Sequence, residues 1–529
     1  MYSFGLELST QSAKYLILDC KTGDIVFKDK FDFDTTFPDY QTKGGVLFSN
    51  ISGLRHTSPL MLIEALEEIF KRLVKSGIDS SKIKAIKVDA MQHCTVYLSS
   101  KFSKVLKSLN TLYSLKDQIS TEITRKTSPI WEDRTPEEEV ELLKKWFKDP
   151  GIENLCGNRA ELRFPASQIM KWAVENPSEY ENTGHIFLLS AFITSILTGK
   201  ISPVDTGDGW GTNLNSLDIK KPDWNKRILK SINSYLKDHG LKSVLEPKIG
   251  KMCHYDEICG KISKYFVKKY GFSSSCIVLA GTGDNPATLL GCGGNIVISL
   301  GSSYTVNGVM DDIIPSKSGE YNIFGYTKNR AMALSVITNG GKVHETFLRK
   351  YLSKEQTLTK EDWETYIDMA KRPSEELRED EPLLLPYLMD ESVPLAKKGI
   401  IRDGFNEDDG ILNIRALHIS QVLSLKIHSS HLSSVKEICV VAGGAKNPFL
   451  RQLIADIFKV KCWSIKETDF AAVLGCAISG LKKIRNFSYE DAVKLVVKKD
   501  ETSITESRSS PYIEKLITRY KMLEEKNKF

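Results

Sequence analysis

Hydrophobic positions along the chain alternate between two periods, one typical of β-strands and one typical of helices. Short apolar runs predict strands at residues 3–9, 14–20, 25–27 and 84–89. A helix is predicted over 58–75, because apolar side chains recur there at steps of three and four residues: Leu60, Ile63, Leu66, Ile69, Phe70 and Leu73. The alternation of strands with helices favours an α/β protein.

The same order of elements begins again near residue 295. A short apolar strand over 295–300 runs into a Gly-Ser-Ser turn, and further strand and helix patterns follow at 321–326, 331–337, 343–351, 411–428 and 437–442. The repeat predicts two α/β lobes, residues 1–292 and 293–485. A helical C-terminal extension is expected over 486–529, because a last helical pattern covers 511–526.

Composition excludes several classes of protein. Of 529 residues, 41% are hydrophobic and 26% are charged, as in ordinary globular proteins. The net charge is 73 − 67 = +6 without a concentrated basic stripe, so no nucleic-acid partner is expected. Apolar runs fall well short of the roughly 20 residues that span a bilayer, so no membrane association is expected.

The ten cysteines indicate a reducing compartment. They are scattered without the spacing of a disulfide framework, and the N-terminus lacks the pattern of a secretion signal. A cytoplasmic protein with reduced thiols is therefore expected. Cys253, His254 and Cys259 have no second ligand pair at zinc spacing, so a metal site is not expected there.

Four turns combine glycine with serine, threonine or aspartate directly after an apolar strand. Small residues let backbone N–H groups approach an anion, and hydroxyl groups add donors. The turn that runs from a strand into an apolar helix, at 441–447, suits nucleotide binding. None is a Walker sequence or a Gly-x-Gly-x-x-Gly fingerprint. One such turn is more often plain structure, but four of them on two lobes favour function: 5–11, 279–286, 299–303 and 441–447.

Four polar or aromatic side chains are candidates for chemistry, each with a structural alternative. Asp284, between Gly283 and Asn285, can accept the proton of a substrate hydroxyl that attacks phosphorus, or can form an Asx-turn. His93 can donate to a sugar hydroxyl or be a satisfied core residue. Arg163 can bind a polar ligand or form a salt bridge, and Trp131 can stack on a sugar or lie in the interior.

In their order along the chain, these motifs resemble the FGGY family of carbohydrate kinases, and within it the eukaryotic-type xylulose kinases. The resemblance covers residues 2–485. Each matching segment is weak alone, and the ordered set is specific: 8–11, 42–46, 92–93, 129–131, 159–164, 190–199, 211–214, 283–287, 299–301 and 443–445.

The resemblance implies a two-lobe, actin-like ATPase fold of the ribonuclease H type, with a cleft between a sugar-binding first lobe and a nucleotide-binding second lobe. It implies transfer of the γ-phosphoryl group of ATP, with Mg²⁺, to a small-molecule sugar. D-xylulose, giving D-xylulose 5-phosphate, is the first expectation. A monomer or a homodimer is consistent with it.

The family pattern also implies roles for individual residues. Asp284 is the expected catalytic base, and the sugar-binding set is His93, Arg163, Asp284 and Asn285. The residues expected beside the nucleotide and its phosphates are Ser9, Thr10, Ser302, Ser303, Trp363, Gly443, Gly444 and Asn447. Glu7 is expected beside Mg²⁺.

Three positions depart from the family pattern. Glu7 stands where the family has aspartate, the turn Ala90-Met91-Gln92-His93-Cys94 lacks two flanking glycines, and Tyr304 replaces a carboxylate. Two alternatives therefore stay open. One is a catalytically weakened sugar or nucleotide sensor on the same fold, and the other is a kinase for another ketose or polyol.

Overall fold

The N-terminal strands form one mixed sheet around β1 (Tyr2–Leu8). In the computed structural model, which describes residues 1–527 apart from positions 328, 356 and 373, β1 pairs antiparallel with its neighbour in sequence and parallel with β5 (Ile83–Ala90). Both strands are almost entirely buried, and the buried positions include the polar side chains of Glu7, Lys87 and Asp89. The strand order is β3 (Ile25–Asp32), β2 (Ser12–Asp19), β1, β5, β12 (Ile277–Leu279) and β11 (Ile258–Lys261), with β13 (Thr282–Gly283) also on β5.

A second mixed sheet repeats this arrangement around β14 (Ile296–Leu300). Its central strand again pairs antiparallel on one side and parallel on the other. The repeat expected near residue 295 is thus present in the topology, with β15 as a strand that the sequence pattern missed. The order is β16 (Asn322–Gly325), β17 (Ala331–Ile337), β15 (Tyr304–Met310), β14, β22 (Glu437–Val441) and β23 (Lys461–Trp463).

Short two-stranded pairs complete the strand inventory. These pairs are separate from the two main sheets. They are β4 (His56–Thr57) with β7 (Ser128–Pro129), β6 (Thr95–Ser99) with β8 (Thr183–Leu188), β9 (Val204–Asp205) with β10 (Met252–Cys253), β18 (Leu383–Tyr387) with β21 (Gly399–Asp403), and β19 (Glu391–Ser392) with β20 (Leu395–Ala396).

The helix predicted over 58–75 is α2 (Pro59–Lys75). Ser58 caps it by accepting a hydrogen bond from the Met61 N–H, and its apolar face lies in the core of the first half. The other helices of this half are α1 (Phe33–Thr36), α3 (Phe102–Lys107), α4 (Leu115–Ile119), α5 (Glu137–Trp146), α6 (Ile152–Cys156), α7 (Pro165–Glu175), α8 (Pro177–Asn182), α9 (Leu189–Thr198), α10 (Thr206–Gly209), α11 (Lys226–Asp238), α12 (Lys264–Tyr270) and α13 (Asp284–Gly291).

The helices of the second half surround α16 (Gly410–Ile427), which is buried on nearly all sides. No helix among the described residues is both long enough and apolar enough to cross a membrane. The helices around α16 are α14 (Gly341–Tyr351), α15 (Lys360–Lys371), α17 (Pro448–Phe458) and α20 (Ile513–Glu525). Two further helices, α18 (Ala471–Arg485) and α19 (Tyr489–Val496), pack against each other rather than around α16.

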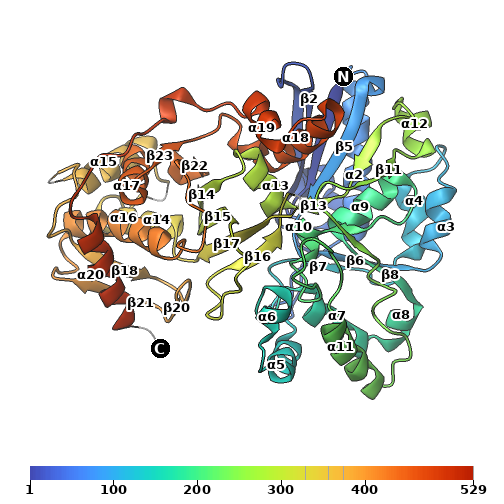
Figure 1. Cartoon of the computed structure of the whole chain (residues 1–529), viewed down its shortest axis with the longest axis horizontal. Coiled ribbons are helices and arrows are strands. Elements are labelled where there is room, and N and C mark those ends of the chain that lie inside the picture. Colours follow the sequence, from blue (N-terminus) through green and yellow to red (C-terminus); the bar gives the residue numbers. More distant parts are fainter. Residues whose placement is uncertain (328, 356, 373, 528–529) are drawn as a thin grey trace.

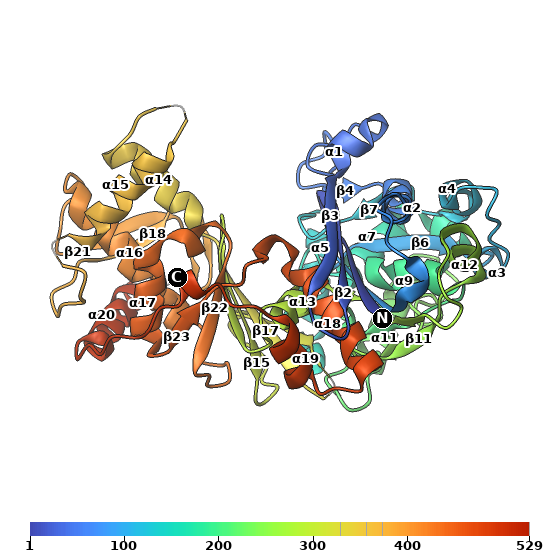
Figure 2. The same ribbon diagram turned by 90° about the horizontal axis from the view of Figure 1, so that it is seen from above.

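Helix α18 returns to the first sheet, although it falls within the segment 293–485 that the sequence assigned to the second lobe. It packs against α13, β1 and β5, and Figure 1 shows this red helix beside the blue strands. The chain then returns to the second half, where α20 packs on α16 and β18 (Figure 2). The expected extension 486–529 therefore contacts both halves. The lobe boundaries themselves stay a prediction.

Two contacts hold together segments that lie far apart in the sequence. Helices α13 and α18 touch backbone to backbone, since a Cβ atom on Gly475 would lie 2.0 Å from the Ala287 carbonyl oxygen, and one on Gly291 would lie 1.8 Å from that of Ala471. At the other contact, the Asn158 side chain accepts from the Ile323 N–H of β16 at 2.7 Å and donates to the Ile323 carbonyl at 2.9 Å.

Replacing Gly475 by alanine should destabilise the protein, because a methyl group there displaces the backbone of the facing helix. We expect a loss of roughly 1–3 kcal/mol in the free energy of unfolding, measured by urea denaturation. Gly399→Ala is the matched control, since a Cβ atom at Gly399 meets nothing within 4 Å. Equal stability of the two variants would contradict the close helix contact.

Candidate functional site

Three carboxyl groups converge where β1, β5 and α13 meet, those of Glu7 and Asp89 buried and that of Asp284 partly buried. Glu7 on β1 lies in register with Lys14 on β2 and with Asp89 on β5, and its carboxylate forms a 3.2 Å ion pair with Lys14. Burial raises the pKa of Glu7, and Lys14 opposes that effect. The pKa of Asp89 is raised well above its ordinary value by burial and by the charges of Glu7 and Asp284.

Asp284 is the first residue of α13, directly after the short strand β13 that pairs with the end of β5. Burial, followed by the nearby charge of Glu7, raises the pKa of its carboxyl group to about 7. A carboxylate with this pKa is matched to accepting a proton near neutral pH. The structure thus places the residue expected to act as base in a setting that suits the task.

An amide network fixes the residue that follows. Asn285 donates through Nδ2 to Gln92 Oε1 at 2.8 Å and to Asp284 Oδ1 at 3.0 Å. Gln92 donates in turn to the Gly207 carbonyl at 3.1 Å. Only glycine fits at position 283, because a Cβ atom there would lie 2.4 Å from Gln92 Cγ. The network therefore sets the direction of the Asp284 and Asn285 side chains.

His93 and Arg163 meet on the ring of Phe164. The imidazole stacks on that ring with centroids 4.5 Å apart, and the Arg163 guanidinium lies 5.9 Å from the same centroid. Nδ1 of His93 is 2.8 Å from the Gly211 carbonyl, and burial, followed by the charge of Arg163, lowers the pKa of His93 to about 3. The imidazole is therefore neutral at physiological pH, with Nδ1 carrying the proton for that bond.

Trp131 is 45% exposed, which excludes the interior position weighed for it. Its Nε1 donates to Thr10 Oγ1 at 3.1 Å, and that hydroxyl lies 3.8 Å from the Met91 sulfur. Trp131 and Arg163 line a cavity of about 410 Å³. Ser9 is not among the residues that line this cavity, and its hydroxyl donates to the Ser12 carbonyl within its own turn.

The second half contains a larger cavity of about 860 Å³. Five of the residues expected around a nucleotide line it: Ser302, Trp363, Gly443, Gly444 and Asn447. Asn447 also caps α17 by accepting from the N–H groups of Phe449 and Leu450. Ser303 does not line this cavity.

Sequence reasoning missed part of the cavity wall at the start of α14. The Gly341 N–H donates to the Gly301 carbonyl at 3.0 Å, and the Lys342 N–H donates to that of Ser302 at 3.2 Å. A Cβ atom on Gly341 would lie 2.4 Å from the Gly301 carbonyl oxygen. The start of α14 is thus held against the Gly-Ser-Ser turn by two backbone hydrogen bonds, which use the N–H groups of Gly341 and Lys342. The signal in the sequence was the Gly-Gly-Lys run after β17.

The acidic residues fit a lightly held divalent cation. Among residues 1–527 without the three omitted positions, no three His, Cys, Asp or Glu side chains are arranged to hold a metal ion. Mg²⁺ ordinarily takes one or two carboxylates, water and substrate phosphates, so the oxygen atoms of Glu7 are of the right chemical kind. Asp89, with an Oδ1 atom that makes no hydrogen bond to the described residues, adds a second carboxylate nearby.

Comparison with known proteins identifies relatives along the whole chain. Residues 2–291, more than half of the sequence, match the family model of the FGGY family of carbohydrate kinases, N-terminal domain. Xylulose kinase 2 of Arabidopsis thaliana is 30% identical over 501 residues, covering 90% of this chain and 86% of the plant protein. The xylulose kinase of Rattus norvegicus is 28% identical over 540 residues, covering 99% and 96%.

Solved structures share the fold. The xylulose kinase from Rhodospirillum rubrum superposes with a TM-score of 0.80 at 13% identity and covers 99% of both chains. A gluconate kinase from Lactobacillus acidophilus gives 0.79 at 19% identity, with 99% and 98% covered. The expected two-lobe, actin-like α/β fold is confirmed.

Removing the Asp284 carboxyl group should stabilise the protein at alkaline pH. With an ordinary pKa of 3.8 and a folded pKa of about 7, the protonated group contributes stability below pH 4 that is lost as the pH rises to 7. We expect Asp284→Asn to melt at a higher temperature than the parent at pH 8, and at the same temperature near pH 4. Thermal unfolding without Mg²⁺ or nucleotide measures this difference.

The exposed Asp24 provides the control, since Asp24→Asn changes a surface carboxyl group. It should shift the melting temperature little at either pH. An Asp284→Asn variant that is less stable than the parent at pH 8 would show that the carboxylate is not held in an unfavourable charged state.

Proposed function

The chain belongs to the FGGY family of carbohydrate kinases, and on this basis we propose that it phosphorylates D-xylulose with ATP, giving D-xylulose 5-phosphate. The observation that carries the proposal is Asp284, a partly buried carboxyl group with a pKa of about 7 at the start of α13, held by Asn285, which also donates to Gln92 beside His93. The plant and rat relatives named as xylulose kinases support the choice of sugar.

Asp284 is proposed as the base. Its ionised form accepts the proton from the terminal hydroxyl of the sugar as that oxygen bonds to the γ-phosphorus of ATP, and the bond from phosphorus to the bridging oxygen of ADP breaks. Half of the carboxyl groups are ionised at a pH equal to the pKa, so the base is available at neutral pH. The amide of Asn285 holds the carboxylate in direction through its 3.0 Å hydrogen bond.

The neighbouring polar groups are proposed to hold the sugar. Neutral His93 offers an imidazole nitrogen to a hydroxyl, and the Arg163 guanidinium has donors left over after its 3.1 Å bond to Asn322 Oδ1. Trp131 is exposed enough to cover an apolar face of a sugar. Arg163 links these residues, because it lies near His93 at the Phe164 ring and lines the 410 Å³ cavity together with Trp131.

ATP is proposed to occupy the 860 Å³ cavity, with its base beside Trp363 and the Gly443–Gly444 turn. Its phosphates would extend toward Ser302, Ser303 and the first turn of α14, while Ser9 and Thr10 would approach from the first lobe. Mg²⁺, when bound near Glu7, supplies charge neutralisation to the phosphates. Approach of the lobes would align the hydroxyl with phosphorus and exclude water.

A kinase for another ketose or polyol is the second candidate. Met91, which is buried and contacts the Thr10 hydroxyl, fills space beside His93, and Cys94 is fully buried behind it. A side chain in that place changes the shape available to the sugar.

The ten cysteines form no disulfide, which supports the proposal that the enzyme works in the cytoplasm.

The test is ADP release by the purified protein with Mg²⁺-ATP, with and without D-xylulose and a panel of other ketoses and polyols. We expect turnover that depends on D-xylulose. Turnover with another sugar alone would favour the second candidate. No turnover with any sugar, in protein that still binds ATP, would favour a sensor.

Asp284→Ala is the decisive variant in this assay. Loss of a base lowers turnover by about 10²-fold or more, while sugar binding, measured by calorimetry, should survive. Near-normal turnover in Asp284→Ala would contradict the assignment of the base. Asp24→Asn again serves as a control with unchanged turnover.

Shortening Glu7 should be tolerated. Glu7→Asp keeps a carboxylate beside Lys14 and shortens it by one methylene group, so we expect activity to be retained or raised. Glu7→Gln, which removes the charge and keeps the length, should raise the Mg²⁺ concentration needed for half-maximal rate. Loss of activity in Glu7→Asp together with unchanged Mg²⁺ dependence in Glu7→Gln would contradict a role beside the metal.

A further inference from the structure

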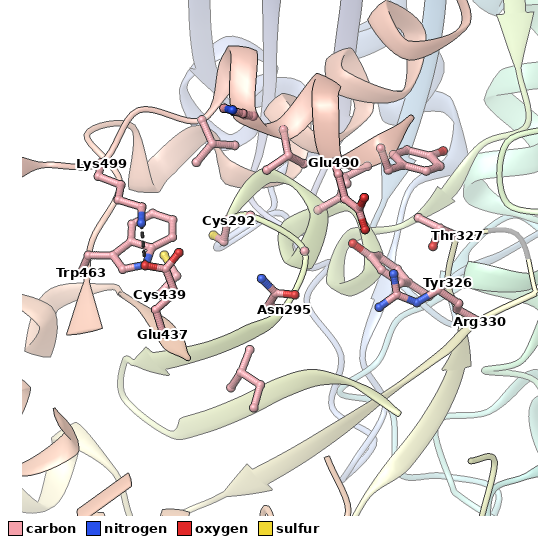
Figure 3. Close-up of a pocket in the computed structure, with 18 residues that line it drawn as sticks. Cys292, Asn295, Tyr326, Thr327, Arg330, Glu437, Cys439, Trp463, Glu490 and Lys499 are labelled. Atoms are coloured by element: carbon pink, nitrogen blue, oxygen red, sulfur yellow. Dashed lines mark hydrogen bonds and ion pairs between the residues drawn. The ribbon is translucent and has the colours of Figure 1, made fainter. Parts of the chain in front are cut away.

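A separate cavity lies between the two halves, away from the residues proposed for sugar and nucleotide. Its volume is about 430 Å³. Figure 3 shows Trp463 and Glu437 of the second sheet on one side, Tyr326 and Arg330 on the other, and Cys292 and Asn295 between them. Residues of α19 complete the wall. Its apolar side chains come from α13, from α19 and from the residue after α19: Leu290, Val493 and Val497.

One side of this cavity is formed by the segment that leads from α13 into β14. Gly293 and Gly294 join α13 to β14, and both have left-handed backbone angles, with φ of +100° and +79°. A Cβ atom at position 293 would lie 3.4 Å from the Trp463 ring, and one at 294 would lie 3.1 Å from the Tyr326 hydroxyl. A molecule bound here would therefore touch the connection and both of its aromatic neighbours.

The cavity wall has an unsatisfied donor. Trp463 is 5% exposed, and its Nε1–H makes no hydrogen bond to any of the described residues. A buried donor without a partner costs about 1–3 kcal/mol. An acceptor atom on a bound molecule would remove that penalty.

The charges of the wall favour an anion. Lys499 is paired with Glu437 at 2.6 Å and lies 4.7 Å from the Trp463 ring centroid. The other charged residues are Arg330, Lys494 and Glu490, so the wall has three cations and two anions, a net charge of 3 − 2 = +1. Within the described residues, the Arg330 guanidinium forms no ion pair and lies 5.9 Å from the Tyr326 ring centroid.

We propose that this cavity is a second ligand site, which takes a small organic anion with a flat apolar body and a carboxylate or phosphate group. The body lies among Trp463, Tyr326 and the valine side chains of this wall. The anionic group accepts from Trp463 Nε1–H or faces Arg330. The proposal goes beyond the kinase reaction, because none of the residues proposed for that reaction lines this cavity.

Benzoate and phenyl phosphate are suitable probes, with neutral benzyl alcohol as the matched control ligand. Binding to the full chain is measured by ligand-detected NMR and calorimetry at fixed ionic strength, with and without saturating ADP. We expect at least one anion to bind saturably, benzyl alcohol to bind at least about tenfold more weakly, and ADP to leave the affinity unchanged. The two anions distinguish a carboxylate from a phosphate ligand.

Variants locate the site. Arg330→Gln, at an exposed position, should weaken anion binding about tenfold, as the loss of a hydrogen bond to a charged group does. Trp463→Phe keeps an aromatic ring and removes the N–H donor, so it tests the hydrogen bond proposed from Trp463 to the anion. Thermal unfolding checks that this variant is folded. Lys498→Ala, an exposed lysine close to α19 that does not line the cavity, is the control and should bind like the parent.

Absence of saturable binding by both anions would overturn the proposal. So would equal affinity of the parent and Arg330→Gln, or displacement of the probe by ADP, which would assign the binding to the nucleotide cavity. These readouts need no turnover, so they stand apart from the test of the kinase function.

Discussion

The backbone contact between α13 and α18 fixes the late helix α18 to the first sheet and to the helix that begins with the proposed base. At Gly291 and Gly475 the facing main chains leave no room for a side chain, so the two helices have one possible separation. Helix α13 begins with Asp284 and is followed directly by Gly293 and Gly294. The proposed base, the contact with α18 and the segment that leads into β14 therefore occupy eleven consecutive residues, 284–294.

Charge is the second constraint, and it acts at the same place. Buried Glu7 and Asp89 and partly buried Asp284 influence one another's charge, with Lys14 as the cation paired to Glu7. Burial and mutual repulsion favour protonation of these groups. A cation that arrives with a substrate would favour their ionised forms and lower the pKa values. Cation binding and availability of the proposed base are thus coupled by electrostatics alone.

Local sequence predicted the central strands of both sheets and several long helices, because their patterns are strong. The apolar runs of β1, β5 and β14, and the heptad-like spacing of α2, leave little choice of structure. The strand β15 was missed because Asn307 and Gly308 interrupt its apolar pattern. The return of α18 to the first sheet was not predictable, since its sequence shows a buried helix and does not say which sheet buries it.

The candidate site was predicted by resemblance more than by local pattern. His93 shows why, because its left-handed φ of +69° and its stacking on Phe164 arise from contacts with residues about 70 positions away. The wall at Gly341 and Lys342 was missed for the same reason, since the turn it faces lies 40 positions earlier. Turn residues indicate where the chain changes direction, but only the tertiary fold determines which turns face one another.

The separation of the two cavities explains why a two-lobe fold suits this chemistry. The cavity proposed for the sugar is lined by residues between 53 and 163, and the cavity proposed for the nucleotide by residues between 300 and 450. Arg163 nevertheless reaches across, because its guanidinium donates to Asn322 on β16 of the second sheet. A sugar that engages Arg163 competes for a side chain already bonded to the other lobe. Occupancy of the sugar side would therefore alter a contact between the lobes before any nucleotide is bound.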